Sequence, residues 1–223
     1  MADAALVIMA KRPLPGRTKT RLTPSLTPDQ AAALYEALLR DTIDLAAGVD
    51  TVDLAVAVTP PDAMDYFRPL VSSGTELLPV ECPHIGGCLS QVLSRLLHDH
   101  AKAVALNSDG PTLPASYLQQ AFVRLDDHDV VIGPSEDGGY YLIGLCQPQP
   151  ALFEDIAWST PSVTPQTIER AQTLGLRVAL LPAWYDVDTV ADLDRLRAAI
   201  MTLLSEGLVH TRHFFSGDYS RYF

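Results

Sequence analysis

The sequence has few of the features that mark several common classes of protein. It contains only three cysteines, with no CxxC spacing, so a disulfide framework is not expected and a reducing, cytoplasmic setting is favoured. No apolar run approaches the roughly 18 to 20 residues of a membrane span. The short apolar stretch near the N-terminus runs into a basic segment instead of a cleavage site, so it is not expected to be a signal peptide.

Basic residues are also scarce. The chain has 16 Lys and Arg against 27 Asp and Glu, a formal net charge of −11. Such a surplus of negative charge repels phosphate groups, so we expect the protein to bind neither nucleic acid nor an anionic membrane. Yet five of the 16 basic residues fall in the twelve-residue segment KRPLPGRTKTRL (11–22), which has no acidic residue; they are Lys11, Arg12, Arg17, Lys19 and Arg21. Any anionic ligand must therefore be held locally, and this segment is the place to hold it.

Strand and helix patterns alternate along the 223 residues, which suit one domain better than two. Short stretches rich in Val, Ile, Leu and Ala predict buried strands at 4–10, 52–58, 102–107, 129–134, 140–145 and 176–182. Helices are predicted from 28 to 47, with Thr27 as N-cap in a capping box, and at 89–100, 114–125, 164–175 and from 189 onward. This alternation predicts an α/β fold, a three-layer sandwich around a mostly parallel sheet.

We expect residues 1–205 to form the domain and 206–223 a tail. The tail is expected to dock on the body, to dock on a second subunit of a homodimer, or to stay loosely ordered, and the sequence leaves these alternatives open. The last helix pattern places Leu193, Leu196, Ile200 and Leu203 on one face.

Carboxylates follow the strands at the edge where such folds bind ligands. Asp109 comes directly after the strand at 102–107, Glu136 and Asp137 follow the strand at 129–134, and Asp186 and Asp188 follow the last strand. Each of them alone is equally well explained as a turn or capping residue. Together they form a set of hard oxygen ligands that suits Mg²⁺ or Mn²⁺ shared with a substrate phosphate.

The basic segment 11–22 lies in the first strand-to-helix loop. It lacks the GxxxxGK[ST] pattern of a P-loop and the GxGxxG pattern of a dinucleotide fold. One interpretation is a solvated surface loop. The other is a clamp in which Lys and Arg side chains hold a polyphosphate, and the clustering against an acidic background favours the clamp.

Four segments carry a family resemblance: IMAKRPLPGRTKTRL, NSDGPTLP, GPSEDGGYYLIGL and YDVDTVADLDRL. Between about residues 5 and 197 they resemble, in matching order, a bacterial family of glycosyltransferase-like proteins with the glycosyltransferase type A (nucleotide-diphospho-sugar transferase) fold. Some members are labelled arsenosugar-biosynthesis glycosyltransferases. The family is related to the nucleotidyltransferases 2-phospholactate guanylyltransferase and molybdopterin guanylyltransferase.

The resemblance implies roles for individual residues. Asp109, Asp186 and Asp188 match metal-binding positions, and the basic segment matches the one that contacts a triphosphate. Lys19, Arg21 and Asp109 are then the expected catalytic residues. The acceptor pocket is expected at Glu136, Asp137, Gly138, Gly139 and Tyr140. The chain departs from the family at HIGGCLSQVL (84–93), where Cys88, Ser90 and Val92 stand in place of the usual acidic, glycine-containing stretch and its Arg, so that both the acid and the Arg are missing from this segment.

These observations predict a Mg²⁺- or Mn²⁺-dependent transferase that uses a nucleotide and a small-molecule acceptor. Five basic residues exceed what a diphosphate needs, which favours nucleotidyl transfer from a nucleoside triphosphate to a small anionic acceptor, with release of pyrophosphate. The first alternative is a glycosyltransferase that uses a nucleotide sugar. The second, motivated by the altered segment 84–93, is a nucleotide-binding protein without catalysis. The sequence does not choose the base or the acceptor.

Overall fold

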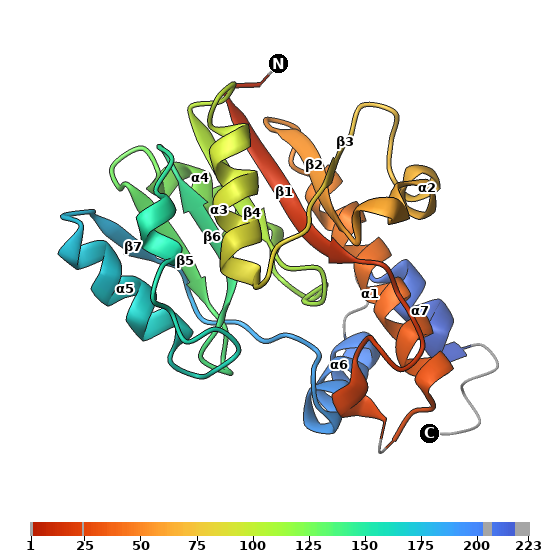
Figure 1. The fold of residues 1–223 in the computed structure, drawn as a ribbon. Coiled ribbons are helices and arrows are strands. Elements are labelled where there is room, and N and C mark those ends of the chain that lie inside the picture. The colour runs from red at the N-terminus through yellow and green to blue at the C-terminus, as the bar shows by residue number, and fades with distance from the viewer. Residues whose placement is uncertain (1, 24, 203–206, 217–223) are drawn as a thin grey trace.

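A seven-stranded sheet forms the centre of the computed structural model, which describes residues 2–23, 25–202 and 207–216 (Figure 1). The strand order is β3-β2-β1-β4-β6-β5-β7. Within the described residues β6 is antiparallel to its neighbours and the other paired strands run parallel. The strands are β1 (Ala4–Lys11), β2 (Asp53–Thr59), β3 (Glu76–Pro79), β4 (Lys102–Leu106), β5 (Val130–Pro134), β6 (Tyr140–Leu145) and β7 (Val178–Leu180).

Helices cover both faces of this sheet. They are α1 (Pro28–Ala47), α2 (Met64–Phe67), α3 (Ile85–Leu96), α4 (Ala115–Arg124), α5 (Val163–Thr173), α6 (Val190–Thr202) and α7 (Val209–Ser216). Four short 3₁₀ helices lie between them: η1 (Thr20–Leu22), η2 (Pro61–Ala63), η3 (Arg68–Leu70) and η4 (Pro150–Phe153).

Successive side chains of the buried strands pack alternately in two separate cores, one on each face of the sheet. Leu6 and Ile8 of β1 pack in a core with α1, α2 and α4, whereas Ala5 and Val7 pack in a core with α3, η4 and α5. This alternation is what a strand covered on both faces requires. The predicted three-layer α/β sandwich is therefore confirmed.

The helix boundaries follow local capping. At α1 the predicted capping box is present, since Thr27 Oγ1 accepts a hydrogen bond from Gln30 N (3.2 Å) and Gln30 Oε1 accepts one from Thr27 N (2.7 Å). Helix α3 begins at Ile85, earlier than the predicted residue 89, because His84 Nδ1 accepts from Gly87 N (3.2 Å) and caps it. The sequence patterns missed β3, α2 and α7, which are too short to show a period.

A third apolar core lies beside the sheet. It joins Leu22, the last residue of the basic segment, and Leu26 to α1, to Leu193 and Leu196 of α6, and to Phe214 of α7. Leu203, predicted on the same face of α6, lies outside the described residues. The described part of the predicted tail contains α7, which packs against α1; the division of the chain at residue 205 remains a prediction.

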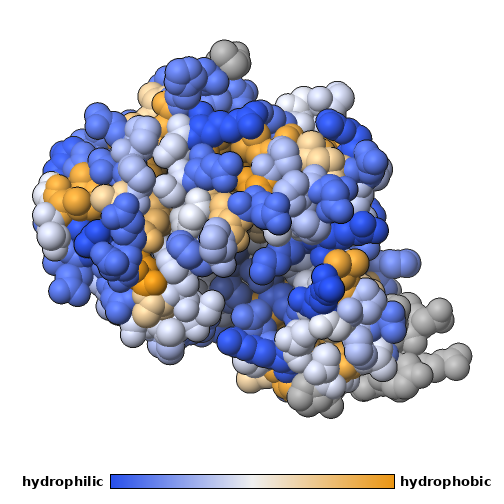
Figure 2. All heavy atoms as spheres, in the orientation of Figure 1, coloured by the Kyte–Doolittle hydropathy of each residue, from blue (hydrophilic) through white to orange (hydrophobic). Residues whose placement is uncertain are grey.

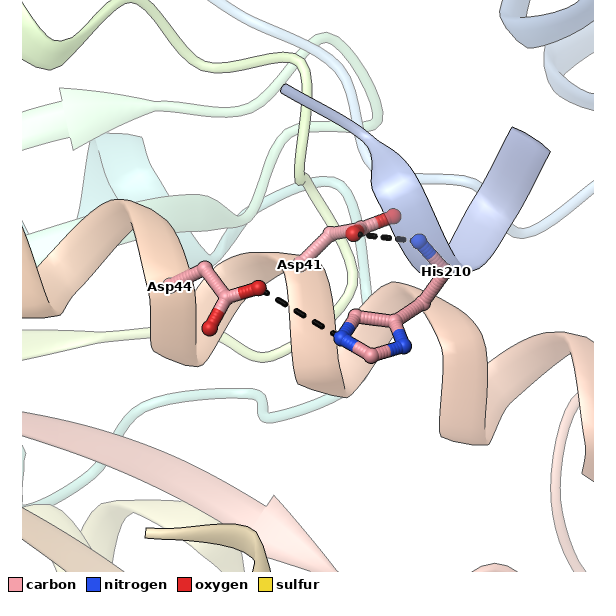
Figure 3. Close-up of side chains that lie close together, drawn as sticks. All are labelled: Asp41, Asp44 and His210. Carbon is pink, nitrogen blue, oxygen red and sulfur yellow. Dashed lines mark hydrogen bonds and ion pairs between the residues drawn. The ribbon is translucent and has the colours of Figure 1, made fainter. Parts of the chain in front are cut away.

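Helix α7 is held by its N-terminal end (Figure 3). The two carboxylate oxygens of Asp41, on α1, accept hydrogen bonds from His210 N (2.9 Å) and Thr211 N (2.8 Å). Asp44 Oδ2 lies 3.4 Å from His210 Nε2. Asp41 thus satisfies backbone donors that the first turn of a helix cannot pair internally.

Within the described parts of the chain, we find no helix with both the length and the apolar character needed to cross a bilayer. Figure 2 shows a surface rich in polar side chains, hollowed between the sheet and the region of α6.

Candidate functional site

Two adjoining cavities open at the carboxyl-end edge of the parallel strands. The first cavity, about 350 Å³, is lined by Lys11, Arg17 and Lys19, among others. The second cavity, about 580 Å³, is lined by residues of the loops at 137–140 and 158–163. The two cavities share Arg21, Asn107, Asp109, Tyr140 and Asp188. They are therefore two parts of one cleft.

The basic and acidic sets meet at Lys19. Its ammonium nitrogen lies 2.6 Å from Asp109 Oδ2 and 2.5 Å from Asp188 Oδ1, and its side chain is only 5% exposed. Arg21 Nη1 lies 3.7 Å from Asp188 Oδ2 and is much more open to solvent. The structure thus brings together side chains that are 90 and 169 positions apart along the chain.

The loop that carries Lys19 is fixed by its own hydrogen bonds. Thr18 Oγ1 accepts from Leu14 N (2.9 Å) and donates to Leu14 O (3.1 Å). Lys19 has a left-handed backbone (φ 49°) just before η1, and Leu22 behind it is buried in the third core. A left-handed conformation is uncommon for a residue other than glycine, so this loop holds Lys19 in a specific position.

Electrostatics keep the ion pairs of Lys19 charged. Burial by itself lowers the pKa of Lys19, but the charges of Asp109 and Asp188 outweigh it and raise that pKa above its usual value. For Asp188, burial raises the pKa, whereas the charges of Lys19 and Arg21 outweigh burial and lower it. A cation is therefore held firmly between two carboxylate oxygens.

Asp186 is in a different environment from Asp188. Asn107 Nδ2 donates to Asp186 Oδ1, and Ser135 Oγ donates to Asp186 Oδ2 (3.0 Å). Burial, reinforced by the charge of Asp109, raises the pKa of Asp186 to about 8. A backbone hydrogen bond from Val187 N to Asp109 O (3.1 Å) ties the two acidic loops to each other.

Not every predicted phosphate-binding residue lines the first cavity. Lys11, Arg17, Lys19 and Arg21 do. Arg12 lines neither cavity, and its guanidinium carbon lies 5.7 Å from the ring centre of Tyr66 in a cation–π contact.

The predicted acceptor residues also divide. Asp137, Gly139 and Tyr140 line the second cavity. Glu136 lines neither of the two and pairs with Arg195 (2.8 Å). Gly138 shapes the turn: its φ is +92°, and a Cβ there would lie 2.2 Å from Pro161 O. Only glycine fits that position without displacing the neighbouring backbone.

Several residues that shape the site were not predicted. Tyr35 of α1 accepts from Lys11 N (3.1 Å) and shares a hydrogen bond with Ser108 Oγ (2.7 Å), which ties the end of β1 to the aspartate loop. Asn107 and Ser135 belong to the motifs NSDGP and GPSEDGG, so their positions offered a signal. Tyr35 looked like an ordinary helix core residue, and Trp158 of the second cavity had no signal at all.

Which carboxylates could hold a metal follows from these contacts. Oxygens of Asp109 and Asp188 already share one cation, the Lys19 ammonium, so they are close enough to share a metal ion. Asp41, Asp44 and His210 also offer ligand atoms within 4.8 Å of one another (Figure 3). However, both oxygens of Asp41 are engaged by the backbone of α7, which explains that cluster as a helix cap.

A family model described as "Uncharacterized protein conserved in bacteria (DUF2064)" matches residues 42–160, more than half of the chain. The chain belongs to this family. It is 28% identical over 184 residues to 2-phospho-L-lactate guanylyltransferase of Methanothermobacter thermautotrophicus, covering 80% of the DUF2064 chain and 78% of that relative. The resemblance noted from the sequence motifs is thus confirmed.

Solved structures agree on the fold of this DUF2064 protein. A Desulfovibrio desulfuricans protein assigned as a nucleotide-diphospho-sugar transferase superposes with a TM-score of 0.89 at 29% identity, over 100% of this chain and 99% of its own. Two more distant structures match the fold alone. CMP-2-keto-3-deoxy-manno-octonic acid synthetase in complex with CTP has a TM-score of 0.59 at 16% identity and coverages of 91% and 100%. A Mycobacterium tuberculosis protein in complex with manganese has a TM-score of 0.55 at 17% identity and coverages of 87% and 97%.

Proposed function

We propose that this DUF2064 protein is a metal-dependent nucleotidyltransferase that uses a nucleoside triphosphate and releases pyrophosphate. The observation that carries the proposal is the position of Lys19, between Asp109 and Asp188 and at the wall of a cavity that also presents Lys11, Arg17 and Arg21. The similarity to a guanylyltransferase supports the same class of reaction.

The charges of the first cavity favour a triphosphate. Four cationic side chains line it against two carboxylates, Asp109 and Asp188. At an effective dielectric constant near 20, a cation about 4 Å from a phosphate charge contributes roughly 4 kcal/mol before desolvation. Two such contacts suffice to hold a diphosphate, so the remaining cations are available to stabilise a pyrophosphate leaving group.

The residues of the cleft fit a hard divalent cation, Mg²⁺ or Mn²⁺. Asp109 and Asp188 would hold it, with Asp186 as a further oxygen donor oriented by Asn107 and Ser135. Bound there, the ion would neutralise phosphate charge during transfer. Lys19 and Arg21 would bind phosphate oxygens and orient the triphosphate, so that catalysis consists of positioning and charge stabilisation without a protein nucleophile. The manganese complex of the mycobacterial neighbour supports the choice of metal.

The alternative is glycosyl transfer from a nucleotide sugar, which the Desulfovibrio neighbour favours. In that case the first cavity would hold a diphosphate and the second cavity would hold the donor sugar beside the acceptor. The segment 84–93, whose composition raised the possibility of a catalytically inactive binder, contributes apolar Ile85 and Leu89 to both cavities.

The test is a thermal-shift screen of nucleoside triphosphates and nucleotide sugars with and without Mg²⁺. Turnover assays follow, in which the small molecules of a cell extract supply the acceptor. A ligand at about 100 times its Kd adds roughly 2.7 kcal/mol of stability, which moves the midpoint by several degrees in a domain of this size. We expect a metal-dependent shift with triphosphates and pyrophosphate release in the extract.

Asp109→Asn should remove the metal-dependent shift and the turnover. The matched control is Asp126→Asn, which breaks a surface pair with Lys102 and should leave both unchanged. Consumption of a nucleotide sugar without pyrophosphate would favour glycosyl transfer. Metal-independent binding without turnover would favour the inactive binder, and no shift with any nucleotide would contradict all three alternatives.

A further inference from the structure

The second cavity differs in charge from the first. It is lined by one cationic side chain against four carboxylates; these residues are Arg21, Asp109, Asp137, Asp186 and Asp188. When a divalent cation binds and Asp186 loses its proton, the cation together with the Lys19 ammonium would offset the three surplus negative charges and leave no positive surplus. A phosphorylated or carboxylated ligand would therefore find no net attraction there, and the triphosphate beside it would add repulsion. This charge balance opposes the small anionic acceptor that the sequence analysis expected.

One wall of the second cavity is aromatic. The half-buried ring of Trp158 stands edge-on to Tyr140 (ring centres 6.3 Å apart, 85°) and stacks with His84 (6.0 Å, 15°). It also lies against Gly86, where a Cβ atom would fall 2.1 Å from Trp158 Cζ2. These three contacts fix the indole, and the missing side chain at residue 86 makes room for it.

Hydrogen-bond acceptors line the same cavity as this aromatic wall. Asp137 Oδ1 accepts from Gly139 N (2.9 Å), and we find no hydrogen bond to its other oxygen among the described residues. The exposed Ser159 and Thr160 line the same cavity. An aromatic face beside carboxylates suits a ligand with apolar C–H surface and several hydroxyl groups, because the ring packs on the former and the carboxylates accept from the latter.

We infer that the second cavity binds a neutral polyhydroxylated acceptor, a monosaccharide or polyol, with Trp158 as its platform and Asp137 as an acceptor for its hydroxyl groups. The inference rests on the proposed function, since it makes this compound the acceptor of the nucleotidyl group. In that reaction a hydroxyl oxygen of the acceptor bonds to the α-phosphorus, the bond from that phosphorus to the pyrophosphate oxygen breaks, and the hydroxyl proton is released.

The test uses the complete chain saturated with Mg²⁺ and a non-hydrolysable triphosphate analogue, whose binding is measured first. Calorimetry then compares glucose, ribose and myo-inositol with glucose 6-phosphate, ribose 5-phosphate and myo-inositol 1-phosphate. We expect at least one neutral compound to bind ten times more tightly than its phosphorylated form. In a Trp184→Phe background, which leaves Trp158 as the remaining tryptophan of the chain, the same compound should change the indole fluorescence.

Three variants test whether this wall of the second cavity binds the acceptor. Trp158→Ala and Asp137→Asn should each weaken binding of the neutral compound about tenfold while leaving nucleotide affinity within twofold. Gly86→Ala should act in the same direction, because its methyl group displaces the indole without removing it. The matched control is Asp155→Asn, in the same loop as Trp158 and 86% exposed, which should change neither affinity.

The possible failures are distinguishable. If the Mg²⁺–nucleotide complex forms but the phosphorylated compounds bind as tightly as the neutral ones, or no compound of the panel binds, the inference about the acceptor is overturned and the proposed function stands. If the Trp158→Ala variant does not fold, the test depends on Asp137→Asn and Gly86→Ala. Unchanged affinity of both variants for the neutral compound would overturn the inference. If the Mg²⁺–nucleotide complex does not form in the wild type, the proposed function itself fails.

Discussion

Replacing Lys19 by Met tests the central contact of the cleft. The substitution keeps most of the apolar stem and removes the ammonium that lies 2.6 Å from Asp109 and 2.5 Å from Asp188. Losing one partner of a buried ion pair costs about 3 to 5 kcal/mol of folding free energy. The two carboxylates are 23% and 36% exposed, so water relieves part of their repulsion and we expect the lower end, about 3 kcal/mol. For a domain of this size that lowers the thermal midpoint by about 6 to 12 °C.

The same variant has a second, opposite effect. In the wild type a divalent cation must compete with the ammonium for the oxygens of Asp109 and Asp188, whereas in Lys19→Met it meets two unpaired carboxylates. We therefore expect Mn²⁺, added without nucleotide, to bind the variant at least tenfold more tightly and to restore part of its lost stability. Affinity for Mg²⁺–triphosphate should fall, since a phosphate-binding cation is gone.

Calorimetric unfolding with and without Mn²⁺ measures both effects, with Lys102→Met as the control. Lys102 also pairs with a carboxylate, that of Asp126, but this carboxylate is largely exposed and the pair lies outside both cavities, so its loss should cost less than about 1 kcal/mol. Equal stabilisation of wild type and Lys19→Met by Mn²⁺ would refute the reasoning, because the ammonium would then not occupy the position that the metal takes.

Three further predictions concern the same cleft. The pKa of Asp186 is raised to about 8, so the folded protein keeps a proton that the unfolded chain loses near pH 4, and stability without metal falls as the pH rises towards 8. Mn²⁺ affinity should rise about tenfold per pH unit from 6 to 8 and level off above. Calorimetry on Asp186→Asn should show no such slope in either quantity. Arg17→Ala should weaken triphosphate binding about tenfold, whereas Arg12→Ala, which lies over Tyr66, should change it less than twofold in the same titration. Gly138→Ala should lower the free energy of unfolding by at least 2 kcal/mol in chemical denaturation, because the φ of residue 138 is positive and the new Cβ would collide with Pro161. Gly139→Ala, whose Cβ would meet nothing closer than 3.2 Å, should lower it by less than 1 kcal/mol. Equal losses in the two variants would contradict this explanation of the turn.

Much of the fold could be predicted because long elements carry a readable period. The strand at 4–10 and the helix after Thr27 were found nearly to the residue, since each has a continuous apolar pattern and clear end signals. Strand β3 offers only two buried residues, Leu77 and Leu78, and no period can be read from two positions. Helix α7 forms against Asp41, a residue far away in the sequence, and local pattern cannot show such a cap.

The site was predictable as far as strand ends determine it. Asp109 and Asp188 follow directly from that rule, and the structure places both at the cleft. Arg12 shows the limit of counting charges in a segment. Its backbone N–H still pairs with Thr59 O (2.8 Å), so the strand geometry continues past Lys11 and the two neighbouring side chains diverge, Lys11 into the first cavity and Arg12 over Tyr66. Trp158 depends on a fit against Gly86, which only the tertiary structure creates.

The third core links distant parts of the chain to the first cavity, where we propose that the nucleotide binds. Leu22, one residue after Arg21, shares its apolar surroundings with Val187 beside Asp188 and with Phe214 near the C-terminus. The positive and negative sides of the first cavity are thus anchored to a single packing unit on α1. If the first cavity binds a triphosphate as proposed, shortening the protein ahead of Phe214, or replacing that ring by a smaller side chain, would weaken this binding without changing any residue that lines the cavity.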